Sequence, residues 1–176
     1  MDHRAMAILV NNAGNNLHRI DSEIEKIVAN TGEKKAINVS DLEATSGIDK
    51  NYNIFEFSRA VGQRNLSRCL EIGEVVGRDK RNTPLLMVIP VLFNYFKRIQ
   101  LVHETGSHQR DELVRKLGIN PYFVQEYVSA ANKYPPVDVR KAFNTLQEMD
   151  LRTKGVGQIH GDDYQLLREL IVRVIS

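Results

Sequence analysis

The chain has 176 residues, of which 42% are hydrophobic and 26% are charged, and its formal net charge is +2. This composition supports a sizeable core and excludes an intrinsically disordered chain, while the small charge permits an acidic partner such as nucleic acid without requiring one. The single cysteine excludes an internal disulfide, and the N-terminus lacks a signal-peptide pattern, so we expect a cytoplasmic protein.

The first part of the chain, residues 1 to 47, carries the pattern of short helices. Residues 4 to 13 predict a helix with no lead-in, which suggests a start cut from a longer chain, and apolar residues at helical spacing from Leu17 to Val28 predict a second helix. Such short helices enclose little core by themselves. The polar segment from Gly47 to Tyr52 is therefore the expected boundary of a second, larger unit, residues 50 to 176.

The most apolar stretch, from Thr83 to Glu104, predicts the central helix of this larger unit, with Thr83 as its cap and Pro84 at its first position. Eight apolar residues follow the spacing of one buried helical face: Leu85, Val88, Ile89, Leu92, Tyr95, Phe96, Ile99 and Val102. The first half is apolar on its other sides too, through Leu86, Met87, Val91 and Phe93, so we expect that half to be enclosed on most sides. The uninterrupted apolar run has only half of the roughly 20 residues that a bilayer span requires. We therefore expect a core helix and no membrane contact.

Amphipathic helices are expected on both sides of the central helix. Their apolar faces lie at residues 54–61, 66–76, 123–131, 139–149 and 164–174, with a shorter helix at residues 110–117. Gly73 is expected to allow the close approach of a neighbouring helix. The nearest candidate for a strand, Ala36 to Val39, is too short to build a sheet. The sequence therefore predicts an all-α fold.

No group of residues predicts catalysis, a metal or a cofactor. A Gly-x-x-x-x-Gly-Lys-Ser/Thr phosphate loop is absent from the sequence. Cys69 lies on an apolar helical face, the place of an inert core thiol. His103 and His108 are five residues apart, whereas two metal ligands on one helical face need a spacing of four, and Gly106 interrupts the helix. The carboxylates of the His160 to Asp163 segment suit the first turn of a helix.

The segment from Arg110 to Tyr134 has the layout of a helix-turn-helix, with a turn at Gly118. Its second helix carries only Glu126 and Lys133 as charged residues, whereas phosphate contacts, which supply most DNA affinity, need lysine or arginine. The charges favour two antiparallel helices of a bundle. A helix-turn-helix DNA-binding regulator stays open as the alternative function.

Several blocks of the chain, taken in order, carry a family pattern. The most specific is the Gly14-Asn15-Asn16-Leu17 turn that leads into Glu23-Ile24-Glu25-Lys26-Ile27. The later blocks are Phe55 to Leu70, Pro84 to Phe96, Leu117 to Val124, and Met149 to Lys154. In this order and spacing, the blocks resemble the delta subunit of the bacterial DNA polymerase III clamp loader over nearly the whole chain.

The resemblance implies that residues 1 to 47 are part of a helical AAA+-type lid domain and that residues 50 to 176 are the helical-bundle collar domain. It implies a non-catalytic, cofactor-free assembly subunit in DNA replication, whose parent holoenzyme is a DNA-directed DNA polymerase. The collar would hold the other clamp-loader subunits in a ring while the complex loads the sliding clamp on primed DNA. The domain that grips the sliding clamp is expected upstream of Met1, so this chain would meet the clamp only through a part absent here.

Two cations are candidate nucleic-acid contacts. Arg152 and Lys154 lie near the end of a long helix, at the start of a glycine-rich segment. Collar domains of the resembling family surround the path of the nucleic acid, and the resemblance therefore implies that Arg152 and Lys154 touch template phosphates. The alternative is that both cations only complement the dipole at the C-terminus of the helix.

Overall fold

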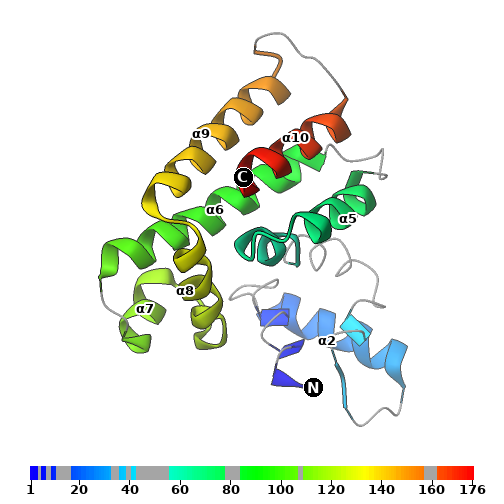
Figure 1. The fold of residues 1–176 in the computed structure, drawn as a ribbon. Helices are drawn as coiled ribbons and strands as arrows, with labels where there is room; N and C mark the ends of the chain where they lie inside the picture. Colours follow the sequence, from blue (N-terminus) through cyan, green and yellow to red (C-terminus); the bar gives the residue numbers. More distant parts are fainter. Residues whose placement is uncertain are drawn as a thin grey trace. The chain divides into compact units, whose positions relative to one another are not determined.

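The computed structural model describes residues 1–3, 5–6, 9–10, 17–32, 36–38, 41–42, 56–77, 84–106, 109–156 and 162–176. Over these residues it contains helices and no strand, which confirms the all-α prediction (Figure 1). The elements are α2 (Leu17–Thr31), α5 (Leu66–Gly77), α6 (Pro84–Thr105), α7 (Arg110–Leu117), the 3₁₀ turn η1 (Pro121–Phe123), α8 (Val124–Lys133), α9 (Pro136–Thr153) and α10 (Asp163–Ile175). Residues 56–62 are helical as well.

The chain divides into two compact units, Met1–Asn53 and Ile54–Ser176. The predicted boundary from Gly47 to Tyr52, the predicted cap Thr83, and residues His108 and His160 lie outside the described residues. Each unit is therefore considered by itself.

Among the described residues of the first unit, apolar side chains from several segments form a core with α2. Ile27 of α2 is buried together with Ala5, Leu9 and Leu42, and a backbone hydrogen bond of 2.8 Å joins Asp2 N to Ile37 O.

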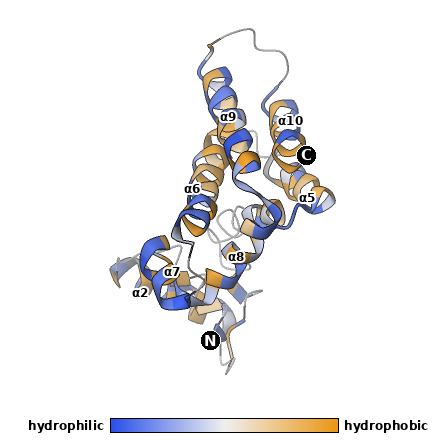
Figure 2. Ribbon diagram, turned by 60° about the vertical axis from the view of Figure 1, so that its left-hand side comes forward, coloured by the Kyte–Doolittle hydropathy of each residue, from blue (hydrophilic) through white to orange (hydrophobic). Residues whose placement is uncertain are grey.

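The second unit is built around α6, which packs against α7, α8, α9 and α10, while α5 packs against α10 (Figure 1). All eight α6 residues that the spacing predicts as inward are buried. Figure 2 shows the apolar colour concentrated on α6 and on the faces of α5 and α10. The exception to the prediction is the other side of α6, where Leu86 is 54% and Phe93 is 50% exposed. Met87 and Val91 are partly buried, so the uncovered part of the first half of α6 is the side with Leu86 and Phe93.

The helix α6 passes through Pro90 without a break. Pro90 and Leu86 are exposed, so the Leu86 carbonyl that loses its helical partner faces the side open to water. By length and composition alone α6 could span a bilayer, but 44% of its most apolar window is buried within the protein. A core helix of a soluble protein passes the same test, and the packing of α6 against four other helices is that of a core helix.

The turn after residues 56–62 has an unusual residue at its centre. Hydrogen bonds from Arg64 N to Val61 O and from Asn65 N to Ala60 O end the helix in a Schellman motif. Arg64 occupies the left-handed position of this motif, with φ of 54°, where glycine is the usual residue. An arginine held there indicates that its side chain compensates for the backbone strain.

The Arg64 guanidinium joins three other elements. It donates to Lys133 O at 3.1 Å and to Ile175 O at 2.8 Å, at the C-terminal ends of α8 and α10. It also pairs with the Asp138 carboxylate in the first turn of α9 and lies over the Tyr134 ring, 4.2 Å from its centre. Burial would raise the pKa of Asp138, but hydrogen bonds from Lys141 and Arg64 hold it below its ordinary value. This arginine therefore fastens the ends of three helices to one turn.

Candidate functional site

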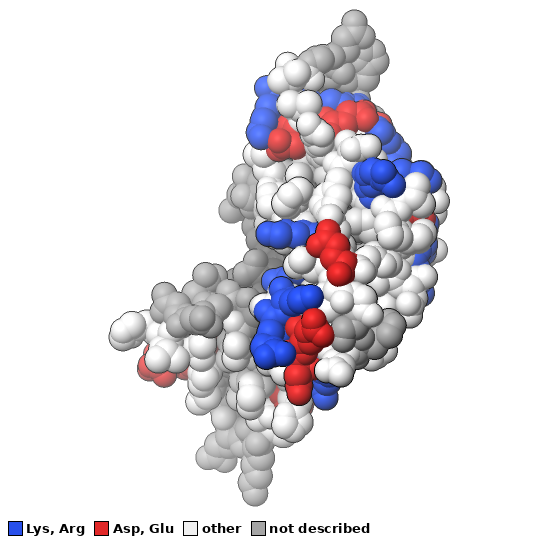
Figure 3. All heavy atoms as spheres, turned by 90° about the vertical axis from the view of Figure 1, so that its left-hand side faces the viewer, with Lys and Arg blue, Asp and Glu red and all other residues white. Residues whose placement is uncertain are grey.

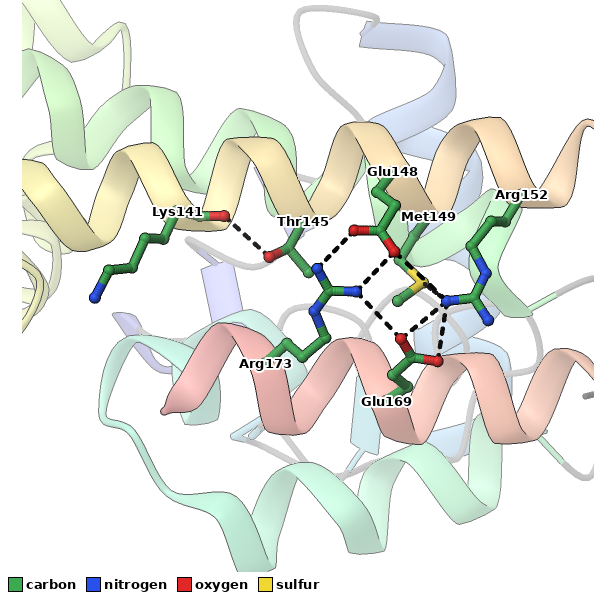
Figure 4. A network of polar contacts seen from close by, with 7 residues as sticks. All are labelled: Lys141, Thr145, Glu148, Met149, Arg152, Glu169 and Arg173. Atoms are coloured by element: carbon green, nitrogen blue, oxygen red, sulfur yellow. Dashed lines mark hydrogen bonds and ion pairs between the residues drawn. The ribbon is translucent and has the colours of Figure 1, made fainter. Parts of the chain in front are cut away.

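The predicted contact residue Arg152 lies in a network of four charged side chains between α9 and α10 (Figure 4). Its Nη1 donates to both carboxylate oxygens of Glu169, at 2.9 and 3.0 Å. Arg173, one turn beyond Glu169 on α10, donates to Glu148 Oε2 at 2.6 Å and to Glu169 Oε1 at 3.1 Å. Two arginines and two glutamates therefore alternate across the seam between the two helices.

The charges of this network compensate one another. The hydrogen bond from Arg152 is the largest effect that lowers the pKa of Glu169, and the bond from Arg173 does the same for Glu148. The Arg152 side chain is only 16% exposed. Its guanidinium thus acts first as an inter-helix clamp, and any phosphate that approached it would compete with Glu169.

Lys154 lies in a different environment from Arg152, although both are at the C-terminal end of α9. It is the residue that caps α9, and its Nζ lies 2.6 Å from Asp150 Oδ2, one turn earlier. The Lys154 side chain is 60% exposed. An exposed pair of this kind is weak, so the ammonium group can leave its carboxylate for another anion.

The lowered pKa of Glu169 predicts a pH dependence of stability. A carboxylate whose pKa in the folded state is below its ordinary value of 4.5 stabilises the fold above that pH, and the contribution is lost as the pH falls through the folded-state value. Glu169→Gln should therefore lower the melting temperature at pH 7. It should also make the melting temperature fall less between about pH 5 and pH 3 than it does in the wild type. Glu104→Gln is the control, because Glu104 accepts its hydrogen bond from the neutral amide of Gln100. Parallel pH profiles for wild type and Glu169→Gln would contradict the prediction.

The other candidate residues do not form a reactive site. Cys69 is buried, and burial raises the pKa of its thiol to about 12, so it is an inert core residue as expected. The His103 Nε2 lies 2.8 Å from Tyr134 O and is engaged in packing α6 against the end of α8. Among the described residues no group of three histidine, cysteine or acidic side chains could hold a metal ion.

A match to a family profile identifies the family to which the chain belongs. The profile describes the C-terminal domain of the DNA polymerase III delta subunit, and it matches residues 51–173. The chain belongs to this family. The predicted family is thereby confirmed, and the match covers all but the last three residues of the unit Ile54–Ser176.

A solved structure agrees with the delta-subunit assignment. The Bacillus subtilis DNA clamp loader delta protein (YqeN) superposes with a TM-score of 0.69 at 20% sequence identity, covering 98% of this chain and 50% of that one. At this identity the likeness shows a shared fold, and the chain spans about half the length of that protein. No curated protein sequence matches the chain.

The delta-subunit assignment gives no support to the helix-turn-helix regulator. The two helices of the predicted motif are present as α7 and α8, joined through Gly118 in a left-handed conformation and the turn η1. The side of α8 with Val124, Tyr127, Ala130 and Ala131 is buried, and α8 packs against α6. Its basic residue Lys133 donates to the Gln63 carbonyl at 3.0 Å. In this delta-subunit domain α8 is a helix of the bundle.

The delta-subunit domain has a groove between α6 and α9 that was not predicted from the sequence. This α6–α9 groove has a volume of about 440 Å³ and is lined by Gln100, His103, Glu104, Pro136, Val139, Arg140 and Phe143. Phe93 extends it along α6, because its ring centre lies 5.3 Å from that of Phe143. The exposure of Phe93 was missed because the first half of α6 was expected to be enclosed.

Most cations of the described residues have a partner, and three do not. Lys97, Arg115 and Arg140 make no hydrogen bond, ion pair or ring contact within the described part of the chain. Figure 3 shows one face of the molecule, where basic and acidic side chains lie next to one another instead of forming one large basic surface. Two of the three unpartnered cations, Lys97 and Arg140, belong to the helices that form the α6–α9 groove.

Proposed function

We propose that this chain is the part of a clamp-loader delta subunit that holds the loader ring together through its collar domain during loading of the sliding clamp on primed DNA. The observation that carries the proposal is the match of the family profile to residues 51–173. The fold shared with a clamp loader delta protein over nearly the whole chain supports it. The role is one of assembly, non-catalytic and without a cofactor, in the cytoplasm.

The surface of the helical bundle is suited to such a role. Large apolar side chains are exposed on several of its helices: Val75 on α5, Leu86 and Phe93 on α6, Val137 and Leu151 on α9, and Val172 on α10. Single exposed apolar side chains are ordinary on a protein surface, so these residues are candidates for subunit contacts and do not by themselves define an interface. The partners that we propose are the other clamp-loader subunits, with the sliding clamp reached through an upstream domain.

Co-purification tests the proposed function. The full-length protein, tagged and expressed with the other clamp-loader subunits, should elute with them as one complex in gel filtration. The same protein alone should bind duplex DNA weakly, whereas a DNA-binding regulator would bind it alone with a steep dependence on salt. A protein that stays separate from the loader and binds duplex tightly would contradict the proposal.

The division into a lid fragment, residues 1 to 47, and a collar, residues 50 to 176, is a proposal with its own test. A protein that consists of residues 50 to 176 should fold by itself, because it contains α6 and all the helices that pack on it. Thermal unfolding followed by circular dichroism should be cooperative. Helical signal without a cooperative transition would show that the two parts depend on each other.

We also propose the phosphate contact of Arg152 and Lys154 in the assembled loader, and the exposed Lys154 is the more available of the two. Lys154→Ala should weaken binding of primed DNA by the reconstituted loader and reduce the slope of affinity against salt by about one unit. Lys141→Ala is the matched control, because Lys141 is also an exposed lysine of α9 paired with a carboxylate. If the slope of affinity against salt is the same for Lys154→Ala and wild type, and the loader assembles normally, the proposed phosphate contact of Lys154 is wrong. Lys154 would then have only its contact with Asp150.

A further inference from the structure

The α6–α9 groove combines an apolar floor with unpartnered charge. Phe143 and Val139 line it, and the Phe93 ring, packed on Phe143, continues it along α6 with half of its surface exposed. The C-terminal half of α6 faces the N-terminal half of α9, as the contact between Phe93 and Phe143 and the antiparallel course of the two helices in Figure 1 show. The groove is therefore a channel between two helices and not an isolated pit.

Two of the three cations that have no partner among the described residues lie at the groove. Arg140 lines the groove, and Lys97 lies on the exposed stripe of α6 between Phe93 and Gln100. Neither cation has a carboxylate or polar partner within the described residues, whereas Lys141, the next residue on α9 after Arg140, is paired with Asp138. The groove carries one acidic residue, Glu104, which accepts a hydrogen bond of 2.7 Å from Gln100. Two cations without a partner among the described residues thus stand against one carboxylate, that of Glu104, so the charge of the groove is not balanced.

We propose that the α6–α9 groove is a docking site for an acidic segment of a partner protein that carries an aromatic or large aliphatic anchor. The anchor covers Phe93 and Phe143, and the carboxylates of the segment pair with Arg140 and Lys97. This chemistry fits the groove better than a nucleic acid does, because an apolar anchor side chain can cover the apolar floor formed by Val139 and Phe143. The inference does not depend on the proposed role in the loader ring, since the groove exists within one chain.

Peptide display on phage tests the inference with a defined probe, a random peptide library. The library is selected on the full-length wild-type protein and counter-selected on the Arg140→Glu variant. The expected consensus has an aromatic or large aliphatic residue within a few positions of aspartate or glutamate. A basic or uncharged consensus, or no enrichment over the counter-selected pool, would overturn the inference.

A synthetic peptide of the selected consensus then locates the site by fluorescence anisotropy. Arg140→Glu should weaken its binding by about tenfold or more, because the charge that attracts the segment becomes repulsive. Phe93→Ala should weaken it through loss of the anchor contact, and Phe93 is exposed enough for the variant to fold. Arg115→Glu is the matched control, the same change at an unpartnered cation of α7 outside the groove, and it should alter binding by less than about twofold.

Three results would contradict the docking site. Equal losses for Arg115→Glu and Arg140→Glu would show non-specific charge attraction. A single-stranded oligonucleotide could bind more tightly than the peptide and displace it. If Arg140→Glu also abolished the binding of that oligonucleotide, the groove would be a nucleic-acid site. Self-association in analytical ultracentrifugation that Phe93→Ala abolishes would make the occupant a second copy of this chain.

Discussion

Leu92→Ala is expected to lower the free energy of unfolding by about 2 to 5 kcal/mol, the range measured for truncation of a buried leucine. Leu92 is 1% exposed and lies in the middle of α6, the helix against which α7, α8, α9 and α10 all pack. Neighbours on several elements cannot all move into the space that the side chain leaves, so a cavity remains. Urea unfolding followed by circular dichroism should show a lower midpoint with an unchanged slope.

Lys97→Ala is the control for this substitution, because Lys97 lies on the same helix but is exposed and without a partner among the described residues. Its effect should stay within about 0.5 kcal/mol of wild type, as for ordinary surface positions. Equal midpoint shifts for Leu92→Ala and Lys97→Ala would mean that the buried face of α6 is assigned wrongly.

Much of the fold could be predicted from the sequence because it depends on local rules. The buried face of α6 follows from the spacing of apolar residues, and the bounds of α7 agree with the expected residues 110–117. The carboxylates of Asp162 and Asp163, which were expected to suit the first turn of a helix, do lie at the start of α10, where Asp162 closes a capping box with Gln165. Gly73 also behaves as expected, because a Cβ there would lie 3.0 Å from Ile171 on α10.

The features that sequence reasoning missed depend on contacts between distant parts of the chain. Arg64 occupies a backbone position for which local rules expect glycine, and its partners are about 70 to 110 residues away. The pairing of Arg152 with Glu169 requires α9 and α10 to be placed side by side. The exposure of Phe93 depends on which side of α6 the other helices cover, and an apolar run does not contain that information.

Gly62 also depends on a contact with a distant part of the chain. Gly62→Ala is expected to lower the free energy of unfolding by about 1 to 3 kcal/mol or more through overpacking. A Cβ at Gly62 would lie 1.9 Å from the Tyr95 hydroxyl oxygen and 2.8 Å from the ring carbon that carries it. Tyr95 is 4% exposed, and its ring centre lies 5.0 Å from that of Tyr127, so the ring cannot move aside freely. The higher helix propensity of alanine offsets about 1 kcal/mol at most.

The Tyr95 hydroxyl allows this mechanism to be tested by a double-mutant cycle. The hydroxyl oxygen is buried without a hydrogen-bond partner among the described residues, so Tyr95→Phe alone should cost little and could stabilise the protein. In the Gly62→Ala background the same change removes the closest contact but leaves the ring carbon at 2.8 Å, so stability should recover in part. Unfolding free energies of the four proteins should give a favourable coupling of about 1 kcal/mol. Additive effects, or a Gly62→Ala variant as stable as wild type, would show that the Tyr95 ring can shift and that the glycine is not required by this contact.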